Sequence, residues 1–158
     1  MAGFGEPALH TVDATGLTIG IVATRWHAEL VDTMLARARE AALASGIKPE
    51  DITVARVAGS VEIPVVAQAL ARACDAVVAL GVVIRGDTAH FDYVCRSVTD
   101  GLTRIALDEH TPIGQGVLTV NTLEQARERA GLPESKEDKG WASTVAALDA
   151  AVALRDIG

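Results

Sequence analysis

The hydrophobic pattern of this chain switches repeatedly between short continuous apolar runs and longer stretches of helical period. Residues 76–84 read AVVALGVVI, a run without polar interruption that predicts a strand buried on both faces. Similar runs predict further strands at Leu17–Ala23, Ile52–Ala58 and Val117–Val120. The chain is therefore expected to contain buried parallel strands separated by helices.

Amphipathic helices are predicted after each of these strands. The first ends near Ser45, before Gly46, which has the position of a C′ glycine. Others are predicted from Pro64 to Ala73, from about His90 onward, and from Asn121 or Thr122 to about Ala130, with a final Ala-rich helix after the polar connector Glu134–Asp138. The expected apolar faces comprise Trp26, Leu30, Met34, Ala38 and Ala41 in the first helix, and Phe91, Val94, Val98, Leu102 and Ile105 in the third. The glycine-rich segment Thr111–Gly116 is expected to be a turn.

Strands that alternate with helices predict a parallel sheet covered on both faces. We expect an α/β fold, a single-domain three-layer α/β/α sandwich with a four-stranded parallel sheet. Its strand order, 2-1-3-4, is predicted by analogy with doubly wound folds. Residues 1–15 are taken as an N-terminal extension and residues 16–158 as the domain.

Composition and charge narrow the function classes. A chain of 158 residues makes about one domain, and it can bury roughly 70% of its unfolded surface. The net charge of −7 argues against a nucleic-acid partner. Cys74 and Cys95 form no CxxC pattern, so neither a zinc site nor a disulfide framework is expected. No apolar run approaches the ~20 residues of a membrane span, and residues 1–15 lack the apolar core of a signal peptide, so we expect no membrane association and a cytoplasmic setting.

Three strand-exit loops hold the candidate chemistry. They are Thr24–His27, Gly59–Glu62 and Arg85–His90, and the carboxyl ends of parallel strands share one edge of the sheet. Gly86, Asp87 and Thr88 precede a helix, where they could bind a phosphate or act as ordinary caps. His90 could move protons near neutral pH, or be a structural or solvated histidine.

Two further side chains in these loops also allow a structural and a functional interpretation. Glu62 could bind polar ligand groups, or be a helix-start carboxylate favoured by the helix dipole. Trp26 could stack on a planar ring or anchor the core. From the residues alone, these alternatives stay open.

Several segments of the chain then carry a family resemblance. They read GSVEIP at residues 59–64, GVVIRGDTAHFDYV at 81–94, PI at 112–113, GVLT at 116–119, RAG at 129–131 and KG at 139–140. In order and spacing, from about Leu17 onward, the chain resembles the lumazine synthase family. The block at residues 81–94 is the most specific part of this likeness.

The resemblance implies a transferase of riboflavin biosynthesis. This family condenses 5-amino-6-(D-ribitylamino)uracil with 3,4-dihydroxy-2-butanone 4-phosphate, giving 6,7-dimethyl-8-ribityllumazine, phosphate and water. The resemblance implies that the reaction uses no metal and no organic cofactor. Two alternatives remain at this point: another phosphosugar enzyme, and a non-catalytic oligomer that binds flavin or lumazine.

The resemblance also implies roles for individual residues. His90 is expected to transfer protons. Trp26 would stack on the pyrimidine, and the ribityl chain and uracil edge would contact Ser60, Val61, Glu62, Val82 and Ile84. Gly86, Asp87, Thr88 and Arg129 would bind the phosphate, Lys139 would lie near the reacting groups, and Gln115 would contact the ring. Arg127 lies two residues from Arg129 and should face another way, so Arg129 is preferred.

Topology predicts that one subunit does not complete this site. His90 belongs to the carboxyl edge of the sheet, whereas Gln115 is expected before the fourth strand, at the amino edge. Arg129 is expected on the order of 12 Å along a helix that runs back toward the amino edge. A neighbouring subunit would then supply both residues, as in the family, whose sites form between adjacent protomers. The long connector Leu132–Asp138 resembles that of the pentameric branch, so we expect a homopentamer.

Overall fold

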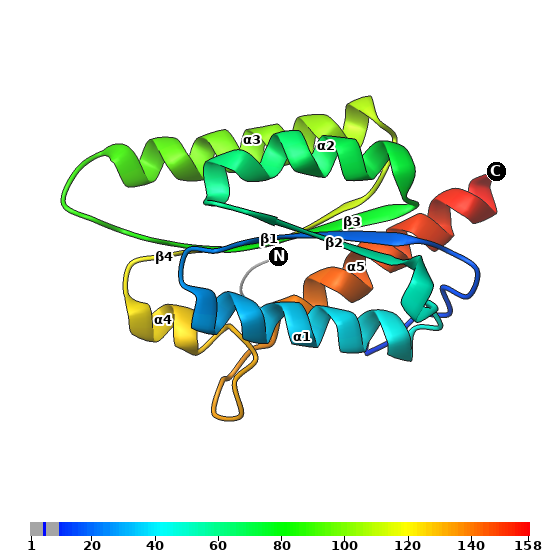
Figure 1. The fold of residues 1–158 in the computed structure, drawn as a ribbon, viewed down its shortest axis with the longest axis horizontal. Coiled ribbons are helices and arrows are strands. Elements are labelled where there is room, and N and C mark those ends of the chain that lie inside the picture. Colours follow the sequence, from blue (N-terminus) through cyan, green and yellow to red (C-terminus); the bar gives the residue numbers. More distant parts are fainter. Residues whose placement is uncertain (1–4, 6–9) are drawn as a thin grey trace.

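The computed structural model describes residue 5 and residues 10–158, which form one α/β sandwich around a parallel sheet (Figure 1). The strands are β1 (Ile19–Thr24), β2 (Ile52–Val57), β3 (Ala76–Ile84) and β4 (Ile113–Val120). The helices are α1 (Ala28–Ala44), η1 (Pro49–Asp51), η2 (Ser60–Glu62), α2 (Ile63–Ala73), α3 (His90–Asp108), α4 (Leu123–Arg127) and α5 (Lys139–Ile157). The strand order is β2-β1-β3-β4 and every pairing is parallel, which confirms the predicted fold class and order.

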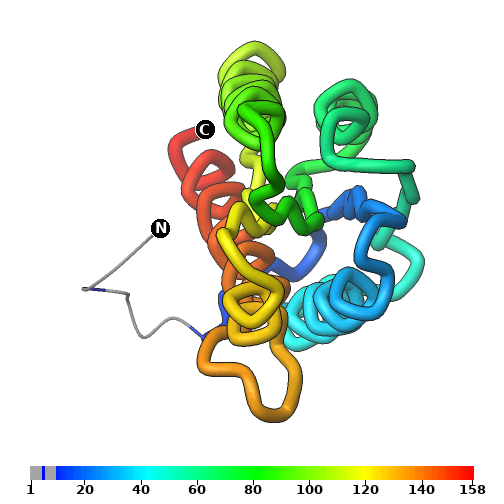
Figure 2. Tube along the Cα trace, turned by 90° about the vertical axis from the view of Figure 1, so that its left-hand side faces the viewer, coloured from blue at the N-terminus to red at the C-terminus, as the bar shows by residue number. Residues whose placement is uncertain are grey.

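Two helical layers cover the sheet. Helices α2 and α3 lie side by side over one face, and α1, α4 and α5 cover the other (Figures 1 and 2). The central strand β3 is buried along most of its length, because helices pack on both its faces. Its bounds agree with the prediction residue for residue.

Strand β4 corrects the predicted turn at Thr111–Gly116. It begins at Ile113, so Gln115 lies inside the strand, paired with Ala79, rather than before it. The glycines that suggested a turn serve close packing instead. A Cβ on Gly114 would overlap the carbonyl oxygen of Ser143 in α5, and one on Gly116 would lie 2.7 Å from Leu80 Cδ2. Sequence reasoning mistook this packing requirement for a turn signal.

The fourth helix is shorter than predicted. Thr122 caps it as expected, since its hydroxyl accepts from the N–H of Gln125 at 3.1 Å, but α4 ends at Arg127 rather than near Ala130. Arg129 therefore lies beyond the helix, in a segment where Ala130 makes an antiparallel bridge with Asp138. The connector that follows projects from the α1 side of the molecule (Figure 2).

Part of the expected N-terminal extension packs on the domain. Ala14 is fully buried, and its N–H donates to the carbonyl of Ser45 at 2.8 Å. Val12 packs against the same core cluster. Residues 1–4 and 6–9 lie outside the described residues. No helix in the described part of the chain is long and apolar enough to cross a membrane.

Candidate active site

A cavity of about 340 Å³ opens at the carboxyl edge of the sheet, and we call it the histidine pocket. The residues that line it are Trp26, His27, Gly59, Ser60, Val61, Glu62, Val82, Val83, Ile84, Gly86, Thr88, His90, Phe91 and Val94. They come from the three predicted exit loops, from the end of β3 and from the first turns of α3. The predicted convergence of these loops is confirmed.

Main-chain contacts hold the exit loops together. The N–H groups of Arg25 and Trp26 donate to the carbonyls of Val57 at 2.9 Å and Ala58 at 3.3 Å, which joins the loops after β1 and β2. Gly81 in β3 leaves room for the turn η2, because a Cβ at this position would lie 3.0 Å from Ser60 Oγ. Close packing at Gly81 therefore holds Ser60, a residue of the histidine pocket, against β3.

Trp26 is not a core residue. Its side chain is 68% exposed, and it lies outside α1 at the rim of the histidine pocket, which corrects the expectation that it shares the buried helix face. The other predicted residues of that face, Leu30, Met34, Ala38 and Ala41, are buried. Next to Trp26, His27 holds a left-handed conformation at φ 54°, which is costly for a side chain with a Cβ. An exposed indole beside a strained corner is suited to stacking on a planar ligand.

Glu62 lies at a helix start, as the structural interpretation expected, and its side chain also makes a capping hydrogen bond. Its Oε1 accepts the main-chain N–H of Gly59 at 2.9 Å, which closes the turn η2. The side chain also lines the histidine pocket. The two interpretations of Glu62 are therefore compatible, because one carboxylate oxygen can hold the turn while the other faces a ligand.

The segment between β3 and α3 is exposed and begins at an anchored arginine. Arg85 donates from Nε to Asn121 Oδ1 at 2.8 Å, and its guanidinium lies 4.4 Å from the centre of the Phe91 ring. Gly86, Asp87 and Thr88 follow in an exposed loop, in which Gly86 and Thr88 line the pocket and Asp87 does not. His90 is the first residue of α3, and its N–H donates to Thr88 Oγ1 at 3.2 Å. The positive end of the α3 dipole therefore lies beside the predicted phosphate loop.

Gln115, Arg129 and Lys139 meet in a second cavity, of about 270 Å³, which we call the cation pocket. Its lining residues are Val98, Thr99, Leu102, Gln115, Val117, Leu118, Thr119, Val120, Arg129 and Lys139. Arg129 donates from Nη1 to the carbonyl of Gln125 at 2.9 Å. Glu137 lies between the two cations, with its oxygens 3.5 Å from Arg129 Nε and 3.3 Å from Lys139 Nζ.

The histidine pocket and the cation pocket have no residue in common. The cation pocket runs along β4, which is an edge strand, and Gln115 and Thr119 are exposed on it. Arg127 belongs to neither pocket. It pairs with Glu29 at 3.6 Å and with Glu134 at 3.2 Å instead. One protomer therefore presents the predicted site residues as two separate groups.

Sequence reasoning missed several residues of the histidine pocket, namely His27, Gly59, Val83, Phe91 and Val94. Phe91 and Val94 belong to the block at residues 81–94, and His27 adjoins Trp26. Their positions next to predicted site residues could have indicated that they line the pocket. Burial raises the pKa of the Cys74 and Cys95 thiols, which makes neither a poised nucleophile. No three His, Cys, Asp or Glu side chains of the described residues gather as a metal site would require.

Comparison with known proteins finds one family over nearly the whole chain. The family model described as 6,7-dimethyl-8-ribityllumazine synthase matches residues 16–155. A protein of that name from Salinispora arenicola (strain CNS-205) is 73% identical over 99% of this chain and 93% of its own. Proteins of the same name from Thermobifida fusca (strain YX) and Mycobacterium leprae (strain TN) are 65% and 60% identical, over 99% and 98% of this chain and 91% and 96% of theirs.

Proposed function

The chain belongs to the 6,7-dimethyl-8-ribityllumazine synthase family, and from this premise we propose how its two pockets divide the reaction. The enzyme is a transferase of riboflavin biosynthesis. It condenses 5-amino-6-(D-ribitylamino)uracil with 3,4-dihydroxy-2-butanone 4-phosphate and releases 6,7-dimethyl-8-ribityllumazine, phosphate and water. Family membership decides against the alternative of another phosphosugar enzyme.

The pyrimidine binds in the histidine pocket. The exposed indole of Trp26 covers its ring, and main-chain groups at Val82 and Ile84 meet its polar edge. Ser60, Val61 and Glu62 surround the ribityl chain. Since Glu62 Oε1 already holds the Gly59 N–H, the other oxygen accepts from the ribityl hydroxyls.

The phosphate of the second substrate binds where β3 passes into α3. Gly86, Asp87 and Thr88 offer main-chain amides and a hydroxyl beside the positive end of the α3 dipole. Arg129 of a neighbouring protomer completes this site, because a guanidinium bonds two phosphate oxygens at once. Lys139 and Gln115 of that neighbour lie near the reacting groups.

The chemistry proceeds by positioning and proton transfer. The 5-amino group of the pyrimidine attacks the ketone carbonyl, and loss of water gives an imine. Loss of a proton from the carbon beside the imine then expels phosphate by β-elimination, and the resulting enol tautomerises to a ketone. The ribityl-bearing nitrogen attacks this ketone, and loss of a second water closes the second ring. His90 moves protons between these steps, and most of the rate comes from holding the two substrates in register. The phosphate-binding groups stabilise the departing anion.

One observation carries the proposal that sites form between protomers. All predicted site residues except Asp87 divide between two pockets without a common member, and the second pocket follows an exposed sheet edge. In a heterologous contact, the β4 edge of one copy packs against the carboxyl edge of the sheet in the next copy. This contact brings the two halves of the site together, and repeating it closes a ring. We take this ring to be a homopentamer, in agreement with the length of connector 132–138, and we place the enzyme in the cytoplasm.

Mixed oligomers test the divided site. His90→Ala and Arg129→Ala protomers are denatured, mixed in equal amounts and reassembled, and lumazine absorbance is followed with both substrates. A ring assembled at random pairs an intact His90 with a neighbour's intact Arg129 at about a quarter of its interfaces. Activity should therefore rise well above that of either variant reassembled alone.

Two results would contradict this proposal. Mixed oligomers no more active than the parent variants would place His90 and Arg129 of one site in the same protomer. Unaltered enzyme that binds the pyrimidine but forms no lumazine would favour the non-catalytic alternative.

A further inference from the structure

Arg129 lies beyond the end of α4, Lys139 is the first residue of α5, and both line the cation pocket. We propose that Arg37, acting through Asp138, is a positioning residue that sets the place of this cation pair. The inference rests on the proposed function, because it assigns Arg37 an effect on the phosphate-bearing substrate. Arg37 lies in α1, outside both pockets of the proposed site.

A short antiparallel pairing first couples the two cations. The N–H of Lys139 donates to the carbonyl of Arg129 at 3.0 Å, and the N–H of Glu137 donates to that of Glu128 at 2.9 Å. Ala130 and Asp138 form an antiparallel bridge next to these bonds. A displacement of Asp138 therefore moves the backbone of both Arg129 and Lys139.

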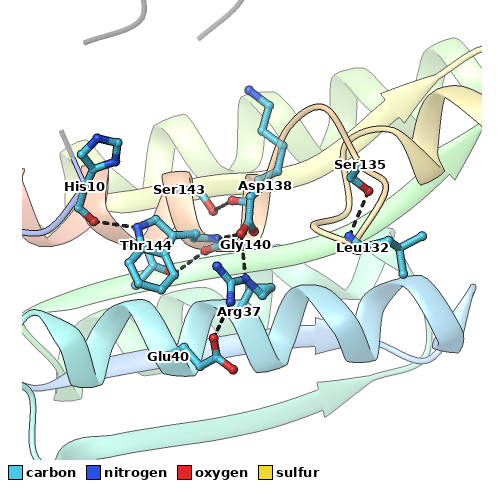
Figure 3. Close-up of polar contacts among 11 residues, drawn as sticks. His10, Arg37, Glu40, Leu132, Ser135, Asp138, Gly140, Ser143 and Thr144 are labelled. Carbon is cyan, nitrogen blue, oxygen red and sulfur yellow. Dashed lines mark hydrogen bonds and ion pairs between the residues drawn. The ribbon is translucent and has the colours of Figure 1, made fainter. Parts of the chain in front are cut away.

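Asp138 is held by both oxygens of its carboxylate. Oδ2 accepts from Arg37 Nε at 2.7 Å, and Oδ1 accepts from the Trp141 N–H at 3.3 Å, where Asp138 acts as the N-cap of α5 (Figure 3). Gly131, at φ 81°, leaves room for this carboxylate, since a Cβ there would lie 2.6 Å from Oδ1. The carboxylate thus joins the start of α5 to α1.

Contacts with residues other than Asp138 also hold the Arg37 side chain in place. Its guanidinium also pairs with Glu40, and its centre lies 4.9 Å from the centre of the Trp141 ring. The Trp141 indole N–H donates to the carbonyl of His10 at 2.6 Å, which fixes the ring in turn (Figure 3). The Arg37 and Asp138 side chains are 34% and 31% exposed, so this pair is less screened by solvent than an ion pair on the open surface.

The hydrophobic core beneath the sheet supports Arg37 and Asp138. Arg37 lies one turn along α1 from Met34, which is fully buried in the main core cluster. The main chain of Met34 lies directly against Gly140, where any Cβ would overlap its carbonyl oxygen. Contacts therefore run without a break from the core through Arg37 and Asp138 to the two cations.

The test compares Arg37→Ala and Asp138→Asn with Arg104→Ala, whose arginine makes an exposed pair with Asp108 on α3. Each intact oligomer is assayed for the KM of each substrate, for kcat and for inhibition by inorganic phosphate. Both test variants should raise the KM for the butanone phosphate and the phosphate inhibition constant about three- to tenfold. The pyrimidine KM should stay within twofold. The double variant should be no worse than either single variant, because both remove the same bond.

Other results overturn the inference. Equal changes in both KM values, or a fall in kcat alone, would show that the pair does not act on the phosphate site in particular. No change at all would show that the pair has no effect on the reaction. If Arg37→Ala fails to assemble, Arg37→Lys and Asp138→Asn decide instead, since each keeps a polar side chain at its position. Arg129→Ala, assayed in parallel, separates the two claims. If it leaves phosphate inhibition unchanged, the phosphate assignment is wrong and this inference falls with it. If only Arg129→Ala has an effect, the inference alone is wrong.

Discussion

Arg127 and Arg129 stand two residues apart, yet only Arg129 enters the cation pocket, while Arg127 turns toward Glu29 and Glu134. The end of α4 at Arg127 separates them, because the chain leaves the helix between the two side chains. The pair is therefore a matched set in which the same residue type occurs inside and outside the proposed site.

Arg129→Ala should raise the KM for the butanone phosphate by about one to two orders of magnitude, because a charge-assisted hydrogen bond contributes about 1.5–3 kcal/mol. Arg127→Ala should leave that KM within about twofold, since its partners are surface carboxylates. Steady-state kinetics with each substrate varied in turn measures both values. A change confined to the pyrimidine KM would assign Arg129 to the wrong substrate.

Trp26 fluorescence should report pyrimidine binding. The chain has two tryptophans, and Trp26 is the exposed one at the histidine pocket, whereas Trp141 packs against Arg37. Addition of the pyrimidine substrate should quench the emission through ring stacking. Inorganic phosphate should leave the emission unchanged. Trp26→Phe is the control, and a quench of equal size in that variant would place the pyrimidine elsewhere.

Gly114→Ala should destabilise the protein by about 1–3 kcal/mol, because the added methyl group meets the Ser143 carbonyl in α5 and forces the helix away from β4. Gly86→Ala is the matched control, since no atom lies within 4 Å of a Cβ at that position. Denaturant unfolding of both variants measures the difference. Equal stabilities would mean that α5 shifts without cost, and the packing account of Gly114 would then be wrong.

The Glu109 carboxylate should make the stability of the protein decrease at acidic pH. Its carboxylate accepts from Arg72 Nε and Gln68 Nε2, both at 3.0 Å, and the bond from Arg72 holds its pKa below the usual range. A depressed pKa means that the unfolded chain binds the proton first as pH falls. The stabilisation is therefore complete above an ordinary glutamate pKa of about 4.3, and it is lost as the pH falls through the folded pKa.

Thermal midpoints of the protein and of Glu109→Gln, compared across pH, measure this effect. The gap between them should be widest near neutral pH and should narrow below about pH 4. Glu50→Gln, at an exposed carboxylate in η1, is the control. A gap that stays constant down to pH 3 would show that the charge of Glu109 contributes nothing.

Most of the fold could be predicted because its signals are local. A continuous apolar run such as 76–84 can be satisfied only by burial on both faces, and β3 follows it residue for residue. The exit loops converge because parallel strands end at one edge, so the histidine pocket was accessible from the strand pattern together with its Gly, Thr and His residues. The resemblance at residues 81–94 gave these residues their expected roles.

The errors arose where distant segments decide the local structure. Gly114 and Gly116 have the composition of a turn, yet they lie in β4 because α5 and Leu80 leave no room for a Cβ. Trp26 continues the helical spacing of Leu30 and Met34, but the chain turns at His27 and leaves the indole exposed. Neither outcome is encoded in the neighbouring residues alone.

The sequence by itself determined the alternation of strands and helices along the chain and the sheet edge that carries His90. Hydrophobic periodicity and chain connectivity suffice for these features. Only the tertiary structure decided that Gln115, Arg129 and Lys139 share one cavity, and that Arg37 reaches Asp138 across 101 positions of sequence. Contacts between residues so far apart depend on how α1, β4 and α5 pack, and no local pattern records that packing.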